Sequence, residues 1–188
     1  DQTIRWVVSD ERVVAAQGNR PITHRAIPND LNYGSQWQYN NVNNPNADLD
    51  AEAAWDIATG GLTVNGDTIV VAVIDDGIDT AHSDFRHNRW INRADIPGAG
   101  IDNDSNGYVD DHLGWNTYTN NDDIKDGNWG GWHGTPVAGI VGAQGNDSNG
   151  VSGVNWDVKV MVIVGGGGES DALAAYGYVL TQRRRYNQ

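Results

Sequence analysis

Hydrophobic positions along the chain gather into a few short segments that long polar stretches separate. Residues 69–74 (IVVAVI) and 158–164 (VKVMVIV) are almost continuously apolar and rich in β-branched side chains. That pattern predicts two strands buried on both faces, as in a parallel sheet covered by helices. Two further short strands are predicted at residues 3–9 and 12–16, on either side of a polar pair.

Three other segments have helical patterns. Residues 51–59 have helix composition, with Asp50 as the expected N-cap and Gly60-Gly61 as the expected stop. Residues 134–142 contain small and apolar side chains, which predicts a helix that packs closely against its neighbours. Residues 171–184 predict an amphipathic helix with a shared face of Ala172, Ala175, Val179 and Leu180. Because strands and helices alternate, we expect an α/β fold.

Length and charge narrow the class of protein. The 188 residues suit one domain with a core. The net charge of −13 argues against nucleic-acid binding, which needs a basic face. No apolar run approaches about 18 residues, so no membrane span is expected. The absence of cysteine excludes disulfides, a thiol nucleophile and Cys-ligated zinc.

The acidic residues are almost all Asp, which favours turns, caps and metal loops over helical surfaces. Only Glu11, Glu52 and Glu169 are Glu, so 22 of the 25 acids are Asp. Residues 92–132 form a predicted loop, and a loop of this length in a compact domain usually has a function. Within it, residues 102–111 (DNDSNGYVDD) alternate oxygen-bearing side chains around a glycine, as calcium loops do. We therefore predict a Ca²⁺ site, against the alternative of a solvated acidic turn, formed by Asp102, Asp104, Asn106, the Tyr108 carbonyl, and Asp110 or Asp111.

Two motifs carry candidate chemistry. The first predicted strand leads into Asp75-Asp76-Gly77, and the carboxyl end of such a strand is where open α/β sheets place their sites. A carboxylate buried there needs a partner, usually a histidine, although Asp75 could merely cap a turn. The second motif places His133 at the head of the small-residue helix, where it could be held between an acid and a nucleophile or be an ordinary surface histidine.

Taken together, the two motifs resemble those of the subtilisin-like serine proteases, the subtilases. VAVIDDGID with the following HSDF resembles the family's aspartate motif, and HGTPVAGI resembles its histidine motif. The resemblance implies a three-layer fold with a mostly parallel central sheet flanked by helices, of which this chain is the N-terminal part. It assigns Asp75 to orient the imidazole and His133 to act as general base and then general acid. One departure is Asp76, where the family usually has Ser or Thr and the kexin and furin branch has Asp.

The resemblance also implies binding sites. A glycine-rich edge would pair with a polypeptide substrate as an extra strand, although a flexible linker explains the same residues: Gly165, Gly166, Gly167, Gly168, Glu169 and Ser170. A second Ca²⁺ site would join distant segments, with side chains of Asp30, Asp84 and Asp147 and carbonyl groups of Gln144, Asn149 and Val151.

The family's serine motif, Gly-Thr-Ser-Met-Ala, and the downstream oxyanion Asn do not occur in these residues. We therefore expect them on a second chain or a missing segment. Residues 1–26 precede the region that resembles a mature N-terminus at 27, and they are either a prodomain remnant or an N-terminal extension. The sequence predicts part of a secreted, calcium-stabilised endopeptidase, located outside the cell, in the periplasm or at the cell surface. The alternatives are a catalytically incomplete calcium-binding module for scaffolding or adhesion and, more distantly, an inhibitor-like prodomain fragment.

Overall fold

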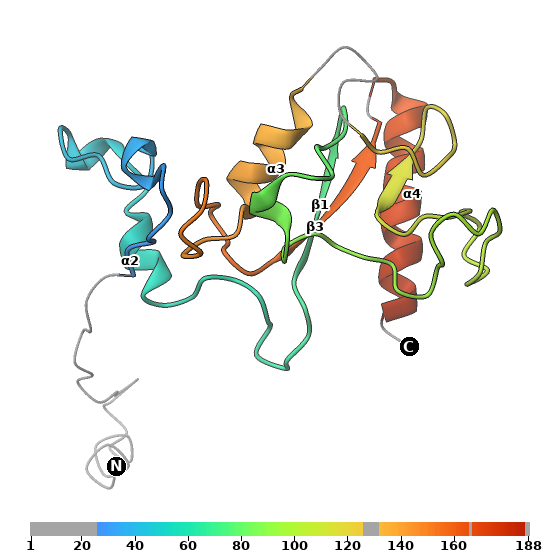
Figure 1. The fold of residues 1–188 in the computed structure, drawn as a ribbon, viewed down its shortest axis with the longest axis horizontal. Helices are drawn as coiled ribbons and strands as arrows, with labels where there is room; N and C mark the ends of the chain where they lie inside the picture. The colour runs from blue at the N-terminus through green and yellow to red at the C-terminus, as the bar shows by residue number, and fades with distance from the viewer. Residues whose placement is uncertain (1–25, 126–131, 166, 187–188) are drawn as a thin grey trace, which may run out of the picture.

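The structure, a computed structural model, describes residues 26–125, 132–165 and 167–186 (Figure 1). The strands predicted at residues 3–9 and 12–16 lie outside this part of the chain. The elements follow one another as η1 Tyr33–Ser35, η2 Pro45–Ala47, α2 Ala51–Trp55, β1 Val70–Asp75, η3 Ser83–Phe85, β2 Gly114–Asn116, α3 Gly134–Gly142, β3 Lys159–Val164 and α4 Glu169–Tyr186.

A parallel sheet of three strands, in the order β1-β3-β2, lies at the centre of the described residues. Val71 lies opposite Val160, and Trp115 of β2 lies opposite Ile163. The predicted strands at 69–74 and 158–164 are therefore confirmed to within one residue. The sequence analysis missed β2, which falls inside the predicted loop at 92–132.

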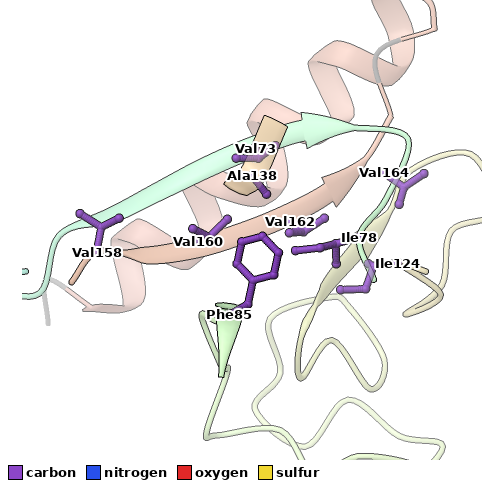
Figure 2. Close-up of a cluster of buried hydrophobic side chains, with 9 residues drawn as sticks. All are labelled: Val73, Ile78, Phe85, Ile124, Ala138, Val158, Val160, Val162 and Val164. Atoms are coloured by element: carbon purple, nitrogen blue, oxygen red, sulfur yellow. The ribbon is translucent and has the colours of Figure 1, made fainter. Parts of the chain in front are cut away.

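The two faces of the sheet bury different sets of side chains. Figure 2 shows the first set, in which Val158 and alternate residues of β3 meet Val73 of β1 and Ala138 of α3: Val158, Val160, Val162 and Val164, with Ile78, Phe85 and Ile124. The second set places the intervening β3 residues against α4 and nearby aromatic rings: Met161 and Ile163, with Trp90, Trp115, Ala175 and Tyr178. Because α3 and α4 lie on opposite sides of the sheet (Figure 1), the predicted three-layer α/β arrangement is confirmed.

The helices differ from the sequence analysis in their details. The helix α3 has the predicted bounds, but α2 ends at Trp55 instead of Thr59, and the Asp50 side chain does not cap it. In α4, Leu180 is 46% exposed, whereas Tyr178 is fully buried. The face of α4 that meets the sheet is thus rotated from the predicted one, and it includes the buried amide of Gln182.

The N-terminal described segment is attached through a cluster of aromatic residues. Tyr39, Trp55 and Trp156 pack together with Ala51, and the indole N–H of Trp55 donates a 2.8 Å hydrogen bond to the carbonyl of Val154. Residues 26–55 are thereby joined to the segment that leads into β3. None of the described helices has the length and apolar character that a bilayer crossing requires.

Candidate active site

Asp75 and His133 meet where the end of β1 faces the head of α3. The Nδ1 atom of His133 lies 2.9 Å from each carboxylate oxygen of Asp75. The side chain of Asp75 is 15% exposed and that of His133 is 74% exposed. A sheltered carboxylate thus holds one nitrogen of an imidazole ring that is otherwise open to solvent.

Asp75 also raises the pKa of His133. The hydrogen bond to Asp75 is the largest cause, followed by the negative charge of Asp75, and the charge of Asp76 adds to them. A raised pKa means that the imidazolium form is favoured. That property suits a histidine that has to accept a proton during a reaction.

Asp76 binds the backbone at the start of α3. Its Oδ2 atom accepts a 3.1 Å hydrogen bond from the N–H of His133, and its Oδ1 atom accepts a 2.6 Å hydrogen bond from the N–H of Gly134. Burial is the largest influence and would raise the pKa of Asp76, but the N–H donors of Gly134 and His133, the contact with Asp75 and the charge of His133 together lower it. The sequence analysis treated Asp76 only as a departure from the family pattern. The feature that could have indicated its role is that it is a second acid directly after the predicted strand.

Two further contacts tie α3 to the turn after β1. The N–H of Asp79 donates a 2.7 Å hydrogen bond to Oγ1 of Thr135. At Gly134 a Cβ would collide with the carbonyl oxygen of Gly77, so glycine is what permits the helix to approach this closely. The position of His133 relative to Asp75 therefore follows from contacts of its neighbours as well as its own.

The predicted substrate-pairing edge follows β3. Gly165 donates its N–H to the carbonyl of Asp75 at 3.0 Å, and Gly166 lies outside the described residues. Gly167 and Gly168 form a bend. Glu169 and Ser170 form the first turn of α4 instead of continuing an extended edge, and their part in substrate binding stays a prediction. Substrate pairing by the glycines stays a prediction.

The loop at 102–111 gathers its carboxylates around buried amides. Asp111 is fully buried and accepts hydrogen bonds from Asn92 (2.5 Å), Asn106 (2.9 Å) and Gln182 (2.5 Å). Burial raises the pKa of Asp111. Asp104 accepts a hydrogen bond from Asn92 and forms a 3.3 Å ion pair with Arg185.

Other members of this predicted site lie differently. At Asp102 burial is the largest influence and would raise the pKa, but the N–H groups of Gly107, Asn106 and Ser105 and the side chain of Asp104 together lower it. Asp110 binds the N–H groups of Ala99 and Gly100, away from Asp111, so Asp111 is the better candidate to close the loop. The ring of Tyr108 packs edge-on against Trp115 and Tyr178, which anchors the loop on α4.

The sequence analysis missed the buried Asp95, whose carboxylate accepts the N–H of Asp111 at 3.0 Å. Asp95 lies 16 residues upstream of Asp111, and no pattern of spacing in the sequence linked the two residues. Asn92, Gln182 and Arg185 were also missed, because they reach the loop from other elements.

The residues proposed for the second Ca²⁺ site lie close together despite their distance in sequence. Asp30 accepts the N–H of Asn146 at 2.7 Å, and Asp84 accepts the N–H of Val151 at 3.0 Å and the side-chain amide of Asn149 at 2.7 Å. Burial raises the pKa of Asp147, and the neighbouring Asp30 and Asp84 raise it further.

Two details of this second cluster fit a cation. The side-chain Oε1 of Gln144 is buried without a hydrogen-bond partner among the described residues. The carboxylates of Asp30 and Asp84 also lie close enough to Asp147 to raise its pKa further, so the three form a site of concentrated negative charge. Within residues 26–125, 132–165 and 167–186, however, no three His, Cys, Asp or Glu side chains are grouped as metal ligands.

Comparison with known proteins agrees with the geometry. The profile of the Subtilase family matches residues 66–185. Subtilisin-like protease 1 of Plasmodium vivax is 43% identical over 93 residues, which is 49% of this chain and 14% of that protein. An extracellular protease of Xanthomonas campestris is 30% identical over 174 residues, covering 85% of this chain and 26% of that protein.

A solved structure gives the same picture. A protease from Pseudoalteromonas arctica superposes with a TM-score of 0.52 at 27% sequence identity, covering 79% of this chain and 42% of that one. The chain therefore spans 14% to 26% of the length of the two relatives and less than half of this solved structure.

Proposed function

Because the chain belongs to the subtilase family, we propose that it supplies the acid and the histidine of a serine endopeptidase. The observation that carries this proposal is the pair of 2.9 Å contacts between Nδ1 of His133 and the carboxylate of Asp75. With Nδ1–H bound to Asp75, the other ring nitrogen is left to take a proton from a serine hydroxyl. The same nitrogen then returns the proton to the leaving amine of the cleaved peptide bond.

The serine and the oxyanion Asn are proposed to belong to a second chain or to a segment outside these 188 residues, since the chain contains no Gly-Thr-Ser-Met-Ala. Among the described strands β1 is at the end of the sheet, and its Val70 is 39% exposed. A groove beside it is lined by Val70, Met161 and Val179 and also by basic side chains, among them Arg89, Arg93 and Arg183. A partly exposed strand edge next to this mixed groove is a suitable surface for the remaining part of the sheet.

We further propose that the substrate is a polypeptide bound along the glycines that follow β3. Gly165 is attached to Asp75 through its backbone, so a peptide paired there would pass next to the catalytic pair. The proposed location is extracellular, in the periplasm or at the cell surface, because relatives from Xanthomonas campestris and Dichelobacter nodosus are named extracellular proteases.

Calcium is proposed as a stabilising ion at both acidic clusters. Asp102, Asp104, Asn106 and Asp111 would hold one ion, and Asp30, Asp84, Asp147 and Gln144 would hold the other. The ion would supply positive charge that offsets the repulsion between these carboxylates, and it has no part in the proton transfers above.

The test uses the protein isolated from its source and a fluorophosphonate probe, which reacts with an activated serine. We expect a second polypeptide or a longer chain that contains Gly-Thr-Ser-Met-Ala and becomes labelled. Asp75→Asn should reduce turnover by about 10⁴-fold, as removal of a triad acid does. Asp79→Asn is the matched control, because the carboxylate of Asp79 accepts the N–H of Ala81 within its own turn and does not bind the ring of His133.

A lone 20.4 kDa species that fails to react with the probe would overturn the protease proposal. That result would favour the second candidate, a calcium-binding module for scaffolding or adhesion. The observation behind this candidate is the concentration of buried acids in a chain whose own residues include no serine motif.

A further inference from the structure

Asp76 holds the helix that carries His133 by its first N–H groups. Two consecutive acids bind different parts of this region. Asp75 binds the ring of His133, and Asp76 binds the backbone N–H groups of His133 and Gly134. A carboxylate has two acceptor oxygens and can satisfy both donors at once. An asparagine has one acceptor oxygen and a serine has one hydroxyl, so neither reproduces the arrangement.

The exposure of the histidine makes this backbone attachment important. The side chain of His133 is 74% exposed, so packing does little to fix the ring. Its orientation depends on the contact with Asp75 and on where the backbone of His133 is held. Asp76 fixes that backbone position directly.

The charge of Asp76 also affects how readily His133 is protonated. The N-terminus of a helix carries a partial positive charge on its unpaired N–H groups, which disfavours a cation there. His133 stands at the head of α3 and must become an imidazolium during the proposed catalysis. A carboxylate placed on those same N–H groups offsets the helix charge.

We propose that Asp76 is a positioning residue for His133, which holds the backbone at the head of α3 and offsets the helix charge that opposes formation of the imidazolium. Asp75 and Asp76 are the acidic groups that act on His133 among the described residues. The inference deepens the proposed function and rests on it for its catalytic meaning. Its test measures the ionisation of His133 and the exchange of two amides, so its failure is distinguishable from failure of proteolysis.

The experiment is an NMR titration of the whole 188-residue chain. In the unmodified chain, the amide protons of His133 and Gly134 should shift together when acid protonates Asp76, below the ordinary Asp pKa of 3.8. Asp76→Asn should lower the pKa of His133 by about half a unit, the size expected for one charge at a helix end. It should also speed hydrogen exchange at both amides by about tenfold, as loss of one hydrogen bond allows.

Asp79→Asn is the control, since it removes a charge from the same turn without touching these N–H groups. Asp76→Ser is the second variant, in case the Asn substitution disturbs folding. It should lower the pKa of His133 about as much as Asp76→Asn does, because it also removes the charge and leaves one acceptor oxygen. A purely structural role would lower stability and leave the pKa of His133 in the folded protein unchanged.

The proposal is overturned by any of three results. The first is that the two amides of the unmodified chain do not follow an acid titration. The second is that His133 titrates identically in the unmodified chain and in the Asp76 variants. The third is that Asp79→Asn produces the same shift as Asp76→Asn.

Discussion

Gly134 and Gly139 lie in the same helix, yet substitution by alanine should change stability in opposite directions. In a helix interior, Gly→Ala ordinarily stabilises by about 0.5–1 kcal/mol. At Gly139 nothing lies within 4 Å of an added Cβ, so alanine should raise the unfolding free energy by this full amount. At Gly134 the methyl would overlap the carbonyl of Gly77 and lie 3.0 Å from Oδ1 of Asp76. Neither neighbour can rotate away freely, since one is backbone and the other is engaged by two N–H groups.

Overpacking of this kind costs about 1–3 kcal/mol, which exceeds the small propensity gain at the first residue of a helix. The assay is urea denaturation of the two variants and the unmodified chain, followed by circular dichroism at one pH. We expect Gly139→Ala to raise the unfolding free energy and Gly134→Ala to lower it. Gly134→Ala should also move the pKa of His133 back toward its ordinary value of 6.5, because the helix is displaced from Asp75. Stabilisation by both substitutions would refute the close approach of α3 to the turn after β1.

Three further outcomes are expected. Because the pKa of His133 is raised in the folded protein, its contribution to stability is full below the ordinary value of 6.5 and is lost as pH rises through the folded value; Asp75→Asn should reduce this dependence to the smaller part that Asp76 causes, in urea denaturation at a series of pH values, and an unchanged pH profile would contradict it. Excess chelator should lower the melting temperature and added Ca²⁺ should restore it, since a ligand that binds only the folded state stabilises it; equal melting curves would count against the calcium proposal. Ile163→Ala should cost about 2–5 kcal/mol by denaturation because its side chain is fully buried, whereas Val70→Ala, at a 39% exposed position, should cost much less; similar losses would show that the burial is misassigned.

The elements that could be predicted are those whose sequence signal is local. The strands β1 and β3 are almost continuous apolar runs, and α3 is a run of small and apolar residues. Each of these signals lies within the element itself, so the sequence was enough to locate it. The strand β2 has only three residues, and its extended form depends on pairing Trp115 with Ile163, almost 50 positions later. A pattern search along the chain has no access to that pairing.

The same limit explains the errors at the candidate sites. In α4, the periodicity allowed a face with Leu180, but the sheet meets the face with Tyr178. Asp95 is a single acid whose partner, the N–H of Asp111, depends on the path of the intervening loop. Asp75 and His133 were found because each follows or precedes a recognisable element, whereas the roles of their neighbours depend on how those elements meet.

The helix that carries His133 is held at its start by Asp76 and at its end by backbone hydrogen bonds to the segment after residue 151. At its start, Asp76 binds two N–H groups. At its end, the carbonyls of Ile140 and Val141 accept the N–H groups of Val154 and Asn155, which lie just beyond the loop at 144–151.

The shape of that loop depends on Asp30 and Asp84, whose carboxylates bind its backbone. Burial contributes most to the raised pKa of Asp147, and the charges of Asp30 and Asp84 raise it further, so repulsion among these acids opposes this closed arrangement at neutral pH. A bound cation would relieve the repulsion at one end of a nine-residue helix, about 13 Å long, and so steady the histidine at the other. Calcium and Asp76 would then act on the same rigid element from opposite ends, which gives the proposed metal site an influence on the catalytic pair without any contact with it.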